Sequence, residues 1–222
     1  VHTDEHSVKP RVVFISDSTE IGTVYGKREL RELSAFCRQH DLYLYLDGAR
    51  IASALTAGCN DLTLAELASL VDAFYIGGTK NGALLGEAIV IVNDDLKQDF
   101  RFYLKQKGAL LAKGRILGIQ FQELFKDDLF FELGKHANSM AALLANGIRK
   151  AGFSFLSAPV SNQVFPVFPD SLIRKLSKKY GFHIWRKTDA DHSAVRLVCS
   201  WATPERAVSS FVACLEGSLP LT

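Results

Sequence analysis

The sequence predicts an α/β fold, in which a mostly parallel sheet flanked by helices is followed by a small α+β part. Two short apolar runs, Leu42–Leu46 and Ala73–Ile76, are typical of buried strands in a parallel sheet. Amphipathic helical stretches alternate with these runs, as in strand–helix–strand units. After Asp127 the expected order becomes helix, strand, helix, strand, strand, helix, which is typical of an α+β domain. We therefore expect two domains, at residues 1–126 and 127–222.

The composition is that of an ordinary globular protein. The chain has 222 residues, 48% of them hydrophobic and 23% charged, with a net charge of +2. This charge predicts neither nucleic acid nor a membrane as partner, and the apolar segments are too short to span a bilayer. We expect no metal site. The polar start of the chain shows no signal peptide, and the scattered cysteines favour buried thiols of a cytoplasmic protein over disulfides. These cysteines are Cys37, Cys59, Cys199 and Cys214.

The first expected strand, Val12–Ile15, is a β-branched run of the kind that is buried in sheets. The polar stretch Ser16–Glu20 follows it, and Gly22 and Gly26 permit a tight loop there. On the residues alone, this stretch is equally consistent with cofactor contacts and with a turn and helix cap. The amphipathic pattern of Lys27–His40 then predicts a helix.

The strand Leu42–Leu46 ends in Asp47, and the segment after it, Ala49–Thr56, looks helical. Asp47 is suited to cap that helix, or to serve a site at the edge of the sheet. Arg50 is expected one turn inside the helix, where it either meets a ligand or forms a salt bridge with Asp47. Apolar residues at helical spacing predict a further helix at Leu62–Val71.

The strand Ala73–Ile76 runs into a glycine-rich loop that carries Lys80. Lys80 lies 33 residues after Asp47, which is one strand–helix–strand unit, so both are expected at the same edge of the sheet. A lysine amine can hold a cofactor aldehyde, and a pyridoxal phosphate (PLP) site also needs a carboxylate facing the ring nitrogen. The plain alternative is an exposed loop lysine.

The region after this loop is expected to be an antiparallel strand, Ala88–Val92, and then a long amphipathic helical region, Leu96–Phe125. Gly108 and Gly114 indicate a break near its middle. Basic and aromatic residues alternate along it, which is compatible with a nucleic-acid arm but favours a helix that carries subunit contacts.

The elements of the second domain follow from apolar periodicity and from prolines. Pro166 predicts that its strand lies at an edge or contains a bulge, and Pro204 is expected in the first turn of the closing helix. The expected helices are Phe131–Lys150, Ser171–Tyr180 and Pro204–Leu215, the expected strands are Gln163–Phe168, Phe182–Trp185 and Ala194–Cys199, and Gly152–Asn162 is expected to be a loop.

Arg196 is the informative residue of this second domain, because it interrupts the apolar strand sequence AVRLV. A buried arginine needs an anionic partner, and a guanidinium can hold a carboxylate through two parallel hydrogen bonds. The alternative is an edge strand with Arg196 facing water. Trp185 and His192 are interpreted as packing or surface residues and receive no role.

Four motifs carry a resemblance to a known family. They are STEIGTVYGKREL at Ser18–Leu30, LDGAR at Leu46–Arg50, YIGGTKNGALLGEAIVI at Tyr75–Ile91 and SAVRLVCSWATPE at Ser193–Glu205. As a set they resemble the low-specificity L-threonine aldolases and their β-eliminating-lyase relatives, which are PLP enzymes of fold type I with the aspartate-aminotransferase architecture.

This resemblance implies roles for individual residues. Lys80 would hold PLP and Asp47 would face its ring nitrogen, and both are thus the expected catalytic residues. Arg50 and Thr79 would also contact the cofactor. Arg196, together with Arg50, would bind the amino-acid substrate. The base that takes the β-hydroxyl proton is not identified, and a histidine outside the chain or a bound water is compatible with the sequence.

The implied reaction is cleavage of L-threonine, or a related β-hydroxy-α-amino acid, to glycine and an aldehyde. The sequence lacks the first strands of the family's large domain, which supply the phosphate loop and a histidine that stacks on the cofactor. We therefore expect an inactive C-terminal fragment of a longer enzyme. The alternatives are a β-eliminating lyase on the same scaffold and a non-catalytic dimerisation fragment. The resemblance also implies a homodimer or homotetramer, in which Lys113 and Arg115 would meet phosphate across the interface.

Overall fold

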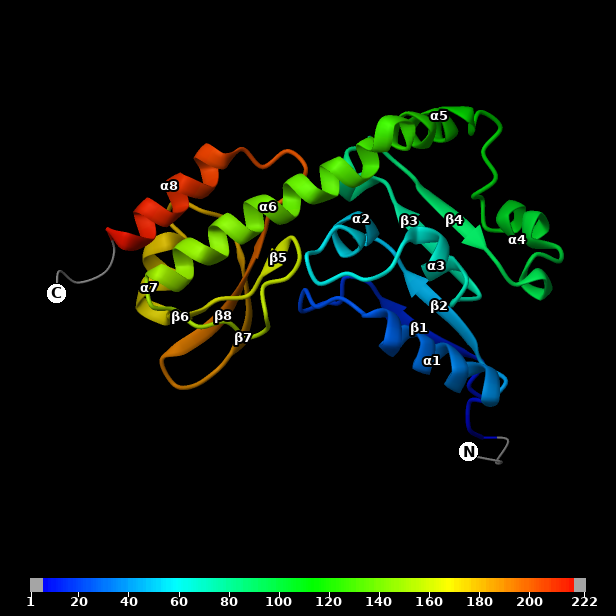
Figure 1. Ribbon diagram of the computed structural model, residues 1–222, viewed down its shortest axis with the longest axis horizontal. Helices are drawn as coiled ribbons and strands as arrows, with labels where there is room; N and C mark the ends of the chain where they lie inside the picture. Colours follow the sequence, from blue (N-terminus) through cyan, green and yellow to red (C-terminus); the bar gives the residue numbers. More distant parts are fainter. Residues whose placement is uncertain (1–5, 218–222) are drawn as a thin grey trace.

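The computed structural model describes residues 6–217, which form two sheets with a separate hydrophobic core beside each (Figure 1). In the first sheet the strand order is β1-β2-β3-β4; the β1–β2 and β2–β3 pairs are parallel and the β3–β4 pair is antiparallel. The predicted α/β class is confirmed, and so is the antiparallel fourth strand. The strands are β1 (Val12–Ser16), β2 (Tyr43–Asp47), β3 (Ala73–Gly77) and β4 (Glu87–Ile91).

Helices cover one face of this sheet. Successive side chains of a strand point to opposite faces, and β2 accordingly buries Leu44 and Leu46 against the helices. On the opposite face, Val12 and Phe14 of the edge strand β1 are 54% and 61% exposed, so the prediction of a buried first strand is wrong for these residues. The covering helices are α1 (Lys27–Gln39), α2 (Ile51–Leu55) and α3 (Leu64–Ala68).

The helix α2 begins later than its sequence suggests. Its N-cap is Arg50, so the prediction that Arg50 lies one turn inside the helix is wrong. The physical reason is that the Asp47 side chain accepts the Ala49 backbone N–H and holds the residues before Ile51 in a turn. α3 is likewise shorter than predicted.

The long helical region contains the break that was predicted. It consists of a 3₁₀ turn, η2 (Asp94–Leu96), and two helices, α4 (Phe100–Gln106) and α5 (Arg115–Leu124). Gly108 lies just past α4 with φ +71°, a left-handed conformation that glycine adopts without strain. The region is therefore not one continuous helix.

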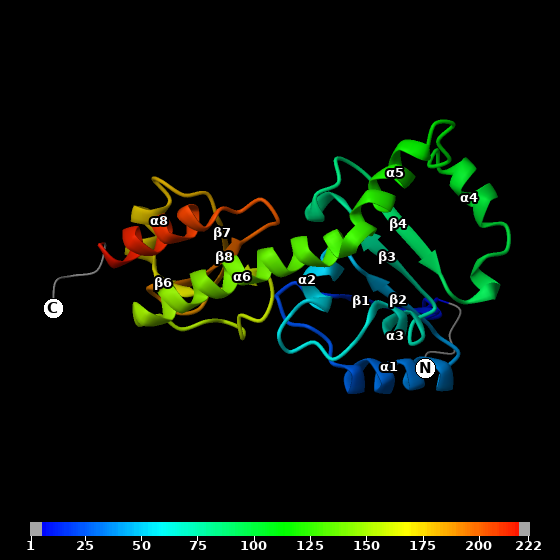
Figure 2. The same cartoon turned by 45° about the horizontal axis from the view of Figure 1, so that its top comes forward.

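A 22-residue helix, α6 (Leu129–Lys150), follows the turn η3 (Lys126–Asp128) and runs from the first core to the second (Figures 1 and 2). Its Phe130 is buried in the first core and its Ile148 in the second. Because α6 contributes to both cores, the domain boundary at residue 126 stays a prediction.

The second sheet is built around β8 (His192–Val198), which pairs antiparallel with three shorter strands. The predicted strand Gln163–Phe168 is in fact two, because Pro166 has no N–H to donate and interrupts the pairing. Pro204 is the N-cap of the last helix and not in its first turn. The remaining elements are β5 (Gln163–Val164), β6 (Val167–Pro169), β7 (His183–Lys187), α7 (Asp170–Leu176) and α8 (Glu205–Glu216).

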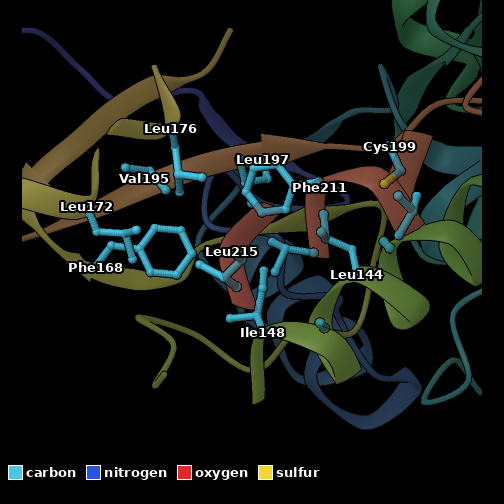
Figure 3. Close-up of a cluster of buried hydrophobic side chains, with 14 of the residues drawn as sticks. Leu144, Ile148, Phe168, Leu172, Leu176, Val195, Leu197, Cys199, Phe211 and Leu215 are labelled. Carbon is cyan, nitrogen blue, oxygen red and sulfur yellow. The ribbon is translucent and has the colours of Figure 1, made fainter. Parts of the chain in front are cut away.

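The second core lies between this sheet and the helices α6, α7 and α8 (Figure 3). Phe168, Phe211 and Leu215 are among its buried side chains. Burying a side chain of this size contributes about 1.5–3 kcal/mol relative to leaving it exposed. This core holds β8, and therefore Arg196, against α6, the helix that also enters the first core.

No helix in residues 6–217 combines the length and the apolar character that a bilayer span requires. Over the same residues, His, Cys, Asp and Glu side chains form no group that could hold a metal ion. Cys37 and Cys199 are buried free thiols, whereas Cys59 is an exposed one, which corrects the expectation that the thiols are buried.

Candidate active site

A pocket of about 180 Å³ lies between the carboxyl ends of β1 and β2 and the second sheet. It brings together four side chains that the sequence singles out, namely those of Asp47, Arg50, Lys80 and Arg196. Thr79 is not among the lining residues. The full lining consists of Ser16, Ser18, Thr19, Glu20, Asp47, Ala49, Arg50, Lys80, Gln163, Trp185 and Arg196.

Asp47 is the last residue of β2 and is held through one of its two carboxylate oxygens. Oδ1 accepts hydrogen bonds from the Ala49 backbone N–H at 2.9 Å and from the Tyr75 hydroxyl at 2.5 Å. Oδ2 has no hydrogen-bond partner among the described residues. The carboxylate is thus oriented by the protein while one oxygen stays available to a ligand.

Gly48 makes this arrangement of β2 and β3 possible. A Cβ atom at this position would lie 1.9 Å from the Tyr75 carbonyl oxygen, far inside van der Waals contact. The Gly48 carbonyl also accepts the Gly77 N–H at 2.9 Å, which joins the end of β2 to the end of β3. The two strand ends that carry Asp47 and Lys80 therefore approach each other closely.

Lys80 lies in a single 3₁₀ turn, η1 (Thr79–Asn81), directly after β3. Its amine has no hydrogen bond or ion pair with any residue in 6–217. Partial burial of the amine lowers the pKa of Lys80, and the Arg50 guanidinium lowers it further, although Asp47 and Glu87 act in the opposite direction. A lowered pKa leaves more of the amine neutral, which is the nucleophilic form.

Arg50 extends its guanidinium toward the same pocket from the N-terminus of α2. Within the described part of the chain it forms no ion pair with Asp47, so the salt-bridge interpretation is wrong. Its Nε is buried without a hydrogen-bond partner. Burial lowers the pKa of Arg50, and the nearby Arg196 lowers it further. An anion bound here would relieve both effects.

Arg196 lies on β8, which has partners on both sides, so the edge-strand alternative is wrong. Its side chain is half-buried, and Nε and Nη2 donate to the Gln163 amide oxygen at 2.9 and 2.6 Å. The guanidinium carbon also lies 6.0 Å from the centre of the Trp185 ring. The expected anionic partner is replaced by a neutral amide, which orients the guanidinium and leaves its charge for a carboxylate.

Two lining residues were missed in the sequence, and four more were left undecided. Trp185 received no role but lines the pocket, and Gln163 attracted no attention as part of an expected edge strand. Gln163 reaches the pocket through pairing with the distant β8, for which the sequence has no local signal, and Trp185 lies on β7, which pairs with the same strand. Four of the five residues of Ser16–Glu20 line the pocket, and Thr19 also forms turn hydrogen bonds with Thr23, so contact of this stretch with a cofactor stays a prediction.

Two further residues lie away from the pocket. The Thr79 hydroxyl donates to Glu87 at 3.0 Å, so its expected contact with the cofactor stays a prediction. The His192 ring is hydrogen-bonded to Asp189 at 3.0 Å in the turn between β7 and β8, as suits a surface residue.

Comparison with known proteins identifies the family. Residues 1–198 match the family model of the beta-eliminating lyases, so the chain belongs to that family. The chain is 38% identical to a low-specificity L-threonine aldolase of Pseudomonas aeruginosa over 202 residues, which are 90% of this chain and 57% of the relative. A second such aldolase, from another Pseudomonas strain, is 36% identical and is matched over 60% of its length. The chain thus spans about three fifths of these relatives.

A solved structure of a Leishmania major threonine aldolase is 48% identical, with a TM-score of 0.93 over 96% of this chain and 63% of that one. A PLP-bound aminotransferase structure from Clostridium difficile, at 11% identity and a TM-score of 0.69, shares the fold alone. The predicted fold-type-I architecture is confirmed by these matches.

The residues present fit PLP. A pyridinium N–H requires a carboxylate oxygen, and Asp47 Oδ2 is unpartnered. The aldehyde of the cofactor requires an amine, and that of Lys80 makes no hydrogen bond within the described residues. Three cationic and two acidic side chains line the pocket, and this excess of positive charge suits a ligand that carries phosphate and carboxylate groups.

Proposed function

We propose that the protein is a PLP-dependent aldehyde-lyase that cleaves L-threonine, allo-threonine or a related β-hydroxy-α-amino acid to glycine and an aldehyde. The observation that carries this proposal is one pocket that holds an unpartnered carboxylate oxygen, an unpartnered amine and two arginines. The likeness to threonine aldolases of Pseudomonas and Leishmania supports it.

Asp47 would face the ring nitrogen through Oδ2 and keep it protonated, because a nearby opposite charge favours the charged form. Tyr75 and the Ala49 N–H hold the carboxylate in place through Oδ1. Lys80 would attach the cofactor through its amine and later exchange with the amine of the substrate. PLP, when bound, supplies an electron sink for the carbon whose bond is broken.

The two arginines would bind the acidic parts of the ligands. Arg196, already oriented by Gln163, would hold the substrate carboxylate, and the bare guanidinium of Arg50 would contact both cofactor and substrate. These contacts would fix the orientation of the substrate's Cα–Cβ bond in the pocket. Such positioning of the reacting groups contributes much of the rate enhancement of enzymes.

We also propose a cytoplasmic homodimer or homotetramer with a domain boundary near residue 126. The free thiols Cys37, Cys59 and Cys199 favour a reducing compartment. Exposed apolar residues on α4 and α5, such as Phe102 at 70% and Ile116 at 60%, support a subunit contact there. Neither Lys113 nor Arg115 lines the described pocket, so a role for them across an interface stays a prediction.

The test is product analysis with the full gene product and PLP. We expect L-threonine to give acetaldehyde and glycine, with loss of both in Lys80→Ala and no loss in Lys150→Ala, a control lysine that is exposed at the end of α6 and outside the pocket. Release of a keto acid and ammonia would instead favour β-elimination, the activity for which the family is named. Aldehyde release and a cofactor absorption band that persist in Lys80→Ala would refute the assignment of Lys80.

The fragment alternative has a separate test. Residues 1–222 are titrated with PLP, and a spectral change would show that they hold the cofactor themselves. An unchanged spectrum, together with a stable dimer of residues 1–222, would support the alternative that these residues are a non-catalytic dimerisation fragment.

A further inference from the structure

Cleavage of a β-hydroxy-α-amino acid requires a group that takes the proton of the hydroxyl. Arginine, glutamine, tryptophan and neutral hydroxyl side chains are poor proton acceptors at neutral pH, which excludes most residues that line the pocket. Among the described lining residues, the carboxylates of Glu20 and Asp47 and the amine of Lys80 remain. Asp47 and Lys80 are occupied by the cofactor under the proposed function. Glu20 is the carboxylate without another role.

The Glu20 carboxylate is oriented at the pocket by one hydrogen bond. The Ser16 hydroxyl donates to its Oε1 at 2.6 Å. Ser16 is the last residue of β1 and pairs in parallel register with Asp47 of β2. Glu20 is therefore anchored beside the strand end that carries Asp47, while Oε2 accepts no hydrogen bond in the described part of the chain.

The turn that carries Glu20 is also hydrogen-bonded to the loop that precedes β5 of the second sheet. The Ser157 hydroxyl donates to the Ile21 carbonyl at 2.6 Å, and the Ser161 hydroxyl donates to the Gly22 carbonyl at 2.7 Å. Gly22 has φ +78°, and a Cβ there would lie 2.9 Å from the Gln163 carbonyl oxygen. The turn therefore packs closely against the first residue of β5.

Gln163 connects this turn to the expected carboxylate anchor. Its Nε2 donates to the Thr19 carbonyl at 3.2 Å, and its Oε1 accepts both hydrogen bonds from Arg196. One side chain thus fixes the place of Glu20 relative to Arg196. In the substrate, the β-carbon is separated from the carboxyl carbon by Cα alone, so a carboxylate fixed relative to Arg196 can serve the β-hydroxyl of a bound substrate.

We propose that Glu20 is the catalytic residue that accepts the β-hydroxyl proton; this inference rests on the proposed function. The O–H bond breaks, its electron pair forms the carbonyl of the aldehyde, and the proton moves to the Glu20 carboxylate. The Cα–Cβ bond breaks at the same time, and its electron pair remains on Cα until a proton is added there to give glycine. Ser16 is the positioning residue.

The experiment compares Glu20→Gln with the wild-type full gene product. The amide still accepts the Ser16 hydrogen bond but takes no proton, so we expect threonine cleavage to fall by about 10²–10⁴-fold, the usual contribution of a general base. Glycine has no β-hydroxyl. Its dissociation constant from a spectral titration, and the exchange of its α-proton in heavy water, should therefore change less than about threefold.

Two further variants make the comparison specific. Glu20→Asp keeps the carboxylate and should restore part of the lost rate. Glu32→Gln, on the exposed side of α1, should leave both cleavage and glycine binding unchanged. A wild-type cleavage rate in Glu20→Gln overturns the inference and leaves the proposed function intact. Loss of glycine binding together with cleavage also overturns it, because Glu20 would then support the site as a whole. Absence of aldehyde from the wild type refutes the proposed function and this inference with it.

Discussion

The two sheets bring charged side chains to the same pocket but hold them in different ways. From the first sheet, Arg50 and Lys80 extend without any hydrogen bond to another described residue at their charged ends. From the second sheet, Arg196 comes from the middle of a central strand and is already gripped by Gln163. The first set stands at turns after strand ends, and the second is packed into a sheet.

This difference indicates which groups of the site bind the cofactor and which bind the substrate. A group that must bond covalently to a cofactor or exchange partners during a reaction cannot be occupied by a protein partner in advance. A group that only anchors one end of a substrate gains from being held rigid beforehand, because less freedom is lost on binding. Arg50 and Lys80, whose charged ends have no hydrogen bond to another described residue, are therefore suited to the cofactor. Arg196, which Gln163 holds in place, is suited to the substrate.

The largest effect on the first side of this comparison is expected for Asp47→Asn. The amide keeps the shape of the side chain but loses the charge that would hold the proton of the ring nitrogen. We expect kcat/KM for threonine cleavage to fall by about 10²–10³-fold, the range found when one electrostatic group is removed from an active site. Steady-state kinetics with saturating PLP measure this. A variant with unchanged kcat/KM would remove Asp47 from the mechanism.

Part of this comparison could be predicted from the sequence. Asp47 and Lys80 each follow a short apolar strand, and the ends of adjacent strands of one sheet meet. Their spacing along the chain was enough to predict that both side chains lie at the same edge of the sheet, where they line one pocket. The start of α2 could not be predicted, because it depends on the Asp47 side chain taking the Ala49 N–H in preference to a helical hydrogen bond.

The hydrogen bonds that Gln163 forms with Arg196 and Thr19 could not be predicted from the sequence. The contact between Gln163 and Arg196 joins residues 33 apart on strands that pair only in the folded sheet. The hydrogen bond from Gln163 to Thr19 spans 144 positions. Periodicity reports which face of an element is buried, and it carries no information on which distant element lies opposite.

On the second side, Arg196→Ala should raise KM for threonine more than it lowers kcat. Hydrogen bonds to a charged group contribute about 1.5–3 kcal/mol, which corresponds to a rise of about 10–100-fold in KM. Gln163→Leu keeps the guanidinium but removes its brace, so its KM should rise by less than that of Arg196→Ala. Kinetics over a range of threonine concentrations separate KM from kcat. Equal effects of the two substitutions on KM would show that bracing and charge cannot be separated here.

Tyr75→Phe should have a smaller effect, because it removes one of the two hydrogen bonds to Asp47 Oδ1 and leaves the carboxylate charge. A hydrogen bond to a charged carboxylate contributes about 1.5–3 kcal/mol in total. Only the part that strengthens in the transition state affects kcat, so kcat should fall by about 2–10-fold. Steady-state kinetics with saturating PLP measure the effect, as for Asp47→Asn. A loss as large as that of Asp47→Asn would mean that the tyrosine itself takes part in the chemistry.

Asp17→Asn should change cleavage least and act on stability. Asp17 is only 2% exposed, and burial raises its pKa from 3.8 to about 7. Between about pH 4 and about pH 7 the unfolded chain has lost this proton and the folded protein retains it, so the wild type loses stability as pH rises through this window. The asparagine does not titrate there.

The melting temperature of Asp17→Asn relative to wild type should therefore increase from about pH 5 to about pH 8, by an amount equivalent to roughly 2–4 kcal/mol. Thermal unfolding of both proteins at the two pH values measures this difference, and Glu32→Gln serves as a control for removal of an exposed carboxylate. A difference that does not depend on pH would show that Asp17 is ionised in the folded protein throughout this range.

The central claim is that Lys80 and Asp47 hold PLP between the ends of the parallel strands β2 and β3. Its most direct test is to find which amine carries the cofactor. The full gene product is incubated with PLP and reduced with borohydride, which makes the attachment permanent, and the peptides are then mapped by mass spectrometry. The account predicts a pyridoxyl adduct on Lys80. An adduct confined to another lysine would contradict it.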